Sequence, residues 1–144
     1  MFAQALKRET GLVASFNDVV ENGAPLLGRL LLSGVFLASG LSKISAFEAT
    51  QGYMTSVGVP PGLLPATIVF EVLAALALIT GWQSRFAALL LAGFSVFTAI
   101  IFHSNFADQI QSIMFLKNMS IAGGLLLLSA YGPGRLSIGQ SARK

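Results

Sequence analysis

The stretch FAALLLAGFSVFTAIIFH, residues 86–103, decides the fold of this chain. No Asp, Glu, Lys or Arg lies between Arg85 and Asp108. A helix that crosses the hydrocarbon core of a bilayer needs about 20 mostly apolar residues. The stretch therefore predicts a transmembrane helix.

The composition of the whole chain supports a membrane protein. Of its 144 residues, 54% are hydrophobic and only 10% are charged, whereas an ordinary soluble domain has about 25% charged residues. So few charges do not cover the surface of a soluble domain of this size. The composition excludes a disordered chain, a nucleic-acid-binding domain and a typical soluble enzyme.

Three further apolar blocks are long enough to cross a bilayer, at residues 26–44, 63–81 and 113–131. We therefore expect an all-α integral membrane four-helix bundle. The turn between the second and third spans is very short, so these helices should be antiparallel neighbours. The chain divides into one membrane domain, residues 26–138, an N-terminal segment, residues 1–25, and a tail, residues 139–144.

The distribution of Lys and Arg near the span ends predicts the orientation. One side of the membrane holds only Lys43 and Lys117. The other side holds Lys7, Arg8, Arg29, Arg85, Arg135, Arg143 and Lys144. We therefore place both termini and the tail in the cytoplasm, and the loops 45–62 and 104–112 outside.

The N-terminal segment, residues 1–25, has apolar residues at three- and four-residue intervals: Phe2, Leu6, Val13, Phe16 and Val20. This spacing predicts an amphipathic helix that lies on the inner membrane surface. The alternative is a partly ordered cytoplasmic tail.

Loop 45–62 contains a short helix by its sequence signals. Ser45 and Glu48 have capping-box spacing, and Gly58 stands where such a helix could end. Aromatic and apolar residues, including Tyr53, would let it lie at the outer interface.

Small residues one helical turn apart predict close contacts between the spans. Gly34 and Ala38 form such a pair in the first span, and Ala88 and Ala92 form one in the third.

Glu71 is the charge that the membrane tolerates least. It lies about eight residues, or about 12 Å, below the predicted outer boundary, where its short side chain does not reach water. It must be protonated, paired, or exposed to a wet cavity. Lys117 and Arg29 are the competing partners, and the sequence does not decide between them. Arg29 and Lys43 also have an alternative role as interface anchors.

Further polar residues gather in the predicted outer half of the bundle. We expect several of them to converge on an outward-opening pocket with Glu71 at its floor. The alternative is a structural ion pair with ordinary loop polarity around it. The full candidate set is Arg29, Lys43, Tyr53, Glu71, His103, Lys117 and Asn118. With one His and no Cys, the chain predicts no metal site, and a redox role would need a cofactor or partner.

Several segments together carry a family resemblance: RLLLSGVFLASGLSKI (29–44), the GYM…GVP stretch (52–60), FEVLAALALITGWQSRFAALLLA (70–92), FLKN (115–118) and YGPGRLSI (131–138). In these segments the sequence resembles the DoxX family of small four-span bacterial membrane proteins. The resemblance implies a four-helix bundle in the inner membrane. It also implies that Arg29, Lys43, Glu71 and Lys117 fall where family members place polar intramembrane groups.

The resemblance implies function more loosely, because some relatives are linked to quinone reduction and others to oxidative-stress complexes. Our first hypothesis is a membrane subunit of an oxidoreductase system that binds a quinone or a small aromatic molecule. The second is a non-enzymatic assembly subunit, and the third a small transporter. Expected partners are membrane lipids, a second copy of the chain or an oxidoreductase. The sequence leaves open whether the chain is catalytic.

Overall fold

The computed structural model describes residues 2–138, with side chains described from Thr10 onward. The predicted tail, residues 139–144, lies outside the described residues. The described chain contains helices and no strand, which confirms the all-α prediction. The helices are α1 (Phe2–Asp18), the π-helical turn η1 (Val19–Gly23), α2 (Ala24–Ser45), α3 (Phe47–Ser56), the 3-10 turn η2 (Pro61–Leu63), α4 (Leu64–Thr80), α5 (Ser84–Phe102) and α6 (Gln109–Tyr131).

Four helical stretches are long and apolar enough to cross a membrane: Thr10–Ser45, Pro61–Thr80, Ser84–Phe102 and Gln109–Tyr131. The prediction of four spans is therefore confirmed. Large apolar side chains such as Leu73, Phe86 and Leu127 are exposed on the outside of the bundle. Lipid is the solvent that suits such a surface, because it removes the cost of exposing apolar groups.

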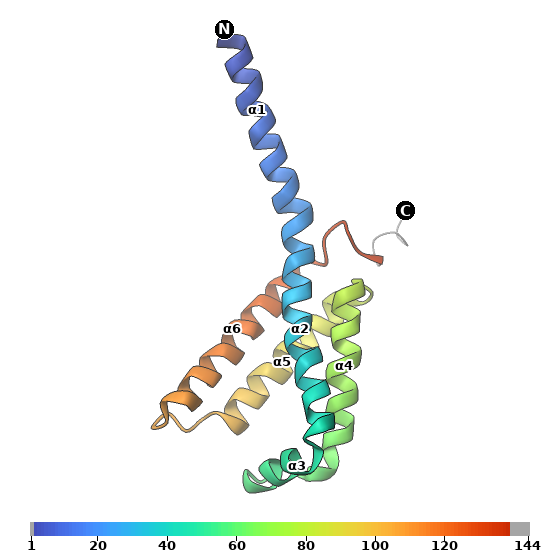
Figure 1. Cartoon of the computed structure of the whole chain (residues 1–144), viewed down its shortest axis with the longest axis vertical. Helices are drawn as coiled ribbons and strands as arrows, with labels where there is room; N and C mark the ends of the chain where they lie inside the picture. Colours follow the sequence, from blue (N-terminus) through green and yellow to red (C-terminus); the bar gives the residue numbers. More distant parts are fainter. Residues whose placement is uncertain (1, 139–144) are drawn as a thin grey trace.

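The first apolar helix begins earlier than the sequence predicted. Residues 2–45 form a continuous helical path, because η1 joins α1 to α2, and α1 projects beyond the bundle (Figure 1). The stretch Thr10–Ser45 has 36 residues, about 54 Å of helix, against a hydrocarbon core of about 30 Å. Part of this helix therefore lies outside the core or is tilted. Placement of residues 1–25 along the membrane surface stays a prediction.

The four long helices pack as two pairs. α2 lies along α4 and α5 lies along α6, while α4 and α5 also contact each other. α5 and α6 slant away from α2 and α4 toward the end of the bundle where α3 lies (Figure 1). The shared core contains Phe36, Ala75, Leu78, Ala88, Leu91 and Leu125. The two pairs are therefore held together by this core and diverge near α3.

Close contacts between helices follow the small residues only in part. Ala88 and Ala92 are buried in the core as predicted. Gly34 and Ala38 are exposed, and a Cβ on Gly34 would meet nothing within 4 Å, so this predicted contact was wrong. The close approach in α2 is at Gly40, where a Cβ would lie 3.0 Å from Cγ2 of Val72 in α4.

The predicted short helix after the first span is α3, but it is not capped as predicted. Ala46 is the N-cap residue and gives no side-chain cap, while the Ser45 hydroxyl donates to the Ser42 carbonyl in its own helix. The prediction of a capping box is therefore wrong. Gly58 follows the end of α3 with φ of +79°, a left-handed conformation that favours glycine.

Candidate functional site

A cavity of about 370 Å³ lies at the α3 end of the bundle. Every helix from α2 to α6 contributes to its lining. Its apolar lining includes Val35, Phe36, Met54, Leu64, Phe94, Phe97, Phe102 and Ile121. Its polar lining is Ser39, Lys43, Thr50, Tyr53, Thr67, Glu71, Thr98, His103 and Asn118.

An ion pair between Lys43 and Glu71 stands on one side of this cavity. Lys43 Nζ donates to both carboxylate oxygens of Glu71, at 2.9 Å to Oε2 and 3.1 Å to Oε1. The Ser39 hydroxyl donates to Oε1 at 3.0 Å and also accepts a hydrogen bond from Lys43. Glu71 is only 2% exposed, whereas the Lys43 side chain is 24% exposed. The buried carboxylate is therefore both paired and hydrogen-bonded, as burial of a charge requires.

This pairing corrects the expectation for Glu71. The sequence offered Lys117 and Arg29 as its partners, and the structure pairs it with Lys43. Ser39 and Lys43 are four residues apart and so share one face of α2. Gly40 lies on the contact between α2 and α4, with its hypothetical Cβ 3.5 Å from Glu71 Cβ. The absence of a side chain at Gly40 thus lets α4 bring Glu71 to this face.

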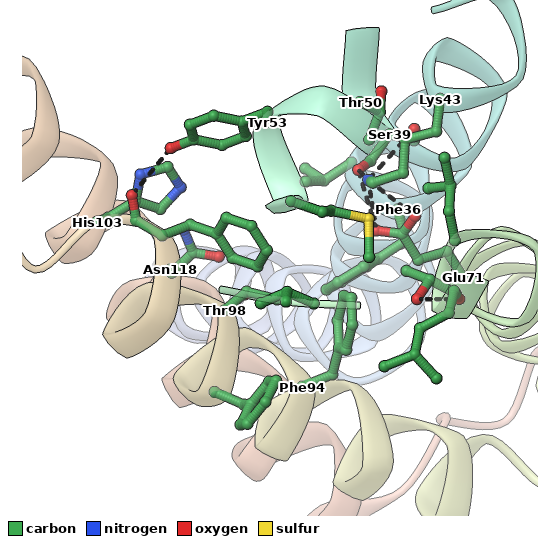
Figure 2. Close-up of a pocket in the computed structure, with 18 of the residues that line it drawn as sticks. Phe36, Ser39, Lys43, Thr50, Tyr53, Glu71, Phe94, Thr98, His103 and Asn118 are labelled. Carbon is green, nitrogen blue, oxygen red and sulfur yellow. Dashed lines mark hydrogen bonds and ion pairs between the residues drawn. The ribbon is translucent and has the colours of Figure 1, made fainter. Parts of the chain in front are cut away.

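A second polar group stands on the opposite side of the cavity. The Tyr53 hydroxyl donates to the Phe102 carbonyl at 3.1 Å. His103 Nδ1 lies 2.7 Å from Gln111 Oε1, and Asn118 Nδ2 donates to the carbonyl of its own helix. Figure 2 shows this group across the pocket from the ion pair, with phenylalanine side chains between the two.

The predicted site residues divide into two sets. Lys43, Tyr53, Glu71, His103 and Asn118 all line the cavity, although binding of a ligand by them stays a prediction. Arg29 and Lys117 are not in this lining.

Both excluded residues were expected nearer to Glu71. Lys117 is exposed on the outer face of α6. Arg29 is buried, and its Nη2 donates to the carbonyl of Leu136, which follows α6. Both are corrections to the predicted cluster, because a sequence gives the depth of a residue in a span better than its rotation about the helix axis.

Four hydroxyl residues of the cavity were missed from the sequence: Ser39, Thr50, Thr67 and Thr98. A signal existed for Ser39 and Thr67, which precede Lys43 and Glu71 by one helical turn and so face the same way. Thr50 and Thr98 have no charged neighbour at that spacing, and only the packing of α3 and α5 brings them to the cavity.

Comparison with known proteins places these residues in a family context. The family model for DoxX matches residues 24–104, which include Lys43, Glu71 and His103. No solved structure matches the chain.

Named relatives extend the similarity over more of the chain. The inner membrane protein YqjF of Escherichia coli K12 is 42% identical over 87% of this chain and 96% of its own length. The inner membrane protein YphA of the same organism is 37% identical over 78% of this chain and 86% of its own. The ER-derived vesicles protein ERV29 of Saccharomyces cerevisiae is 28% identical over 90% of this chain, but only 37% of its own length is covered. The chain belongs to the DoxX family.

Proposed function

We propose that this chain is an inner membrane protein that binds a quinone or another small aromatic molecule in the cavity, as a membrane subunit of an oxidoreductase or oxidative-stress system. The inner membrane location is supported by the four apolar helices and by the names of the two bacterial relatives. The observation that carries the proposal is the cavity, with apolar walls between two polar ends.

The size and lining of the cavity suit a small aromatic ligand. Its volume of about 370 Å³ falls in the range of about 300–1,000 Å³ that is usual for small-molecule sites. The side chains of Phe36, Phe94 and Phe97 offer aromatic faces and edges against which a ring can stack. A para-quinone is flat and carries hydrogen-bond acceptors at two opposite edges, which matches two separate polar ends.

The polar ends can donate hydrogen bonds to those acceptors. The three N–H donors of the Lys43 ammonium already bind both oxygens of Glu71 and Ser39 at the cavity wall, so a ligand oxygen would take the place of one of these acceptors. On the other side the Asn118 amide, which donates one N–H to the Met114 carbonyl, keeps a second N–H donor. A quinone supplies reversible reduction by two electrons and two protons when it is bound. Lys43 would orient one carbonyl oxygen, and Glu71 would keep the ammonium charge compensated.

Ligand binding by the purified protein tests this proposal. Equilibrium dialysis of the detergent-solubilised chain with short-chain ubiquinone and with menadione should show saturable binding. Thr98→Phe, which fills the cavity with a larger side chain, should abolish binding without unfolding the bundle.

The matched control for the cavity is Lys117→Met, which changes an exposed lysine of α6 and should leave binding unchanged. Lys43→Met should weaken binding by at least about tenfold, the effect of one charge-assisted hydrogen bond. Absence of saturable binding to the wild-type chain would refute the proposal.

A second candidate, an assembly or interaction subunit, is favoured by Lys117. This residue lies eight positions, or about 12 Å, into α6 and is exposed. Charged residues within membrane spans almost always pair or face a protein interior. A partner helix on this face of α6 would supply such a partner. Crosslinking from Leu116, an exposed neighbour, should capture a stoichiometric partner that Lys117→Leu reduces.

A further inference from the structure

Arg29, at the end of the bundle opposite the cavity, is buried with fewer partners than its charge requires. Its side chain is 1% exposed, and Nη2 donates to the Leu136 carbonyl. Its Nε and Nη1 atoms have no hydrogen-bond partner. No acidic side chain among the described residues 10–138 forms an ion pair with it. A buried cation without compensation is costly, so this guanidinium is suited to accept an anion.

A second unpartnered polar group belongs to the same turn, where α4 ends and α5 begins. Arg29 Nη1 occupies the space that a Cβ on Gly81 would need, so the guanidinium lies against this turn. Ser84 begins α5 three residues later, is 2% exposed, and its hydroxyl has no hydrogen-bond partner. Three Cα–Cα steps span at most about 11 Å. The first turn of α5 adds backbone N–H groups and the positive end of its helix dipole.

The side chains around this turn place it at the level of lipid headgroups. Trp82 and Tyr131 are 62% and 82% exposed, and such aromatic residues gather at the boundary between lipid and water. Arg85 is exposed and donates to the Tyr131 carbonyl, and Arg135 is exposed nearby in the chain. The acidic residues that follow α2 are Glu48, Glu71 and Asp108. They lie in α3, within α4 and at the start of α6, away from this end, where the nearest acidic residues are Asp18 and Glu21 before α2.

We propose that Arg29 and Ser84, with Arg85 at the rim, bind the phosphate of an anionic phospholipid headgroup. Phosphate oxygens would accept hydrogen bonds from Arg29 Nε and Nη1 and from the Ser84 hydroxyl. Arginine–phosphate contacts are charge-assisted and strong. Basic pockets between membrane helices are a recurrent means of binding anionic headgroups.

The covering segment gives the headgroup a route to Arg29. Residues 132–137, which follow α6, are irregular and contain no helix. The Leu136 carbonyl accepts a hydrogen bond from the guanidinium, and Ser137 lies against Gly81. The Leu136 side chain is exposed. A headgroup that enters beside these residues displaces the Leu136 carbonyl from Arg29. The guanidinium then contacts the negatively charged phosphate instead. A lipid is favoured over free phosphate because the site lies at headgroup depth.

Native mass spectrometry of the delipidated protein in detergent tests the assignment. With equal amounts of phosphatidylglycerol and phosphatidylcholine added, the wild-type chain should bind the anionic lipid at least about tenfold more tightly. Arg29→Gln should remove most of this preference and Ser84→Ala part of it. Arg135→Gln, which removes an exposed arginine at the same end, should retain it.

Two outcomes would overturn the proposal. One is equal binding of both lipids by the wild-type protein, and this comparison decides the question even if Arg29→Gln does not fold. The other is loss of the preference when millimolar inorganic phosphate is added, which would assign the site to free phosphate. The cavity plays no part in this site, so the result is independent of quinone binding.

Discussion

Replacing Lys43 by methionine should destabilise the bundle more than replacing its partner Glu71 by glutamine. In Lys43→Met the carboxylate of Glu71, 2% exposed, loses both hydrogen bonds from the ammonium and keeps only that from Ser39. Stranding a buried charge in this way costs about 3–5 kcal/mol. In Glu71→Gln the stranded group is Lys43, which is 24% exposed and can extend toward water. Its cost should be about 1–3 kcal/mol.

Equilibrium unfolding in mixed micelles, followed by circular dichroism as the fraction of denaturing detergent rises, would measure both free energies. The double variant should be more stable than the sum of the single effects implies, with a coupling of about 1–3 kcal/mol. Lys117→Met is the matched control, because it makes the same change at an exposed lysine. If Lys43→Met destabilises no more than this control, the ion pair does not support the fold as we argue.

Three further predictions concern helix packing and orientation. Gly40→Ala should lower stability by about 1 kcal/mol, because its Cβ would lie 3.0 Å from Val72, whereas Gly93→Ala, with open space around it, should raise the melting temperature slightly. Gly81→Ala should be more harmful, by about 2 kcal/mol or more in the same unfolding assay, because φ is +76° and Arg29 fills the space. A single cysteine at Ser104 should react with an impermeant thiol reagent in intact cells, and one in α1 should not, if both termini are cytoplasmic; the chain has no cysteine of its own.

The spans were predictable because hydropathy depends on the local sequence alone. The predicted third span, residues 86–103, differs by one or two residues from α5, Ser84–Phe102. The first span differs more, because its helix continues through a π-helical turn into α1. The sequence predicted residues 1–25 as a separate segment, but a helix outside the hydrocarbon core tolerates polar residues such as Asp18 and Glu21.

The partner of Glu71 was less predictable, because it depends on how each helix is rotated. Depth along a span follows from residue number, and by depth Lys117 was a reasonable partner. The rotation of α6 turns Lys117 outward, while the contact at Gly40 turns Lys43 toward α4. A contact surface between two helices is a tertiary property, and a small residue at any of several positions can provide it. Gly34 and Gly40 look alike in the sequence, and only the fold separates them.

The division of the helices into two pairs has a consequence for biosynthesis. The ion pair belongs wholly to the first-made pair, since Ser39, Lys43 and Glu71 come from α2 and α4. The opposite polar side depends on His103 and Asn118, which enter the membrane later with α5 and α6. Neither half encloses the cavity alone, so the pocket comes into existence only when the halves dock. By mass action, a small molecule that fits the finished pocket favours the docked form and so acts as a chaperone of this last step.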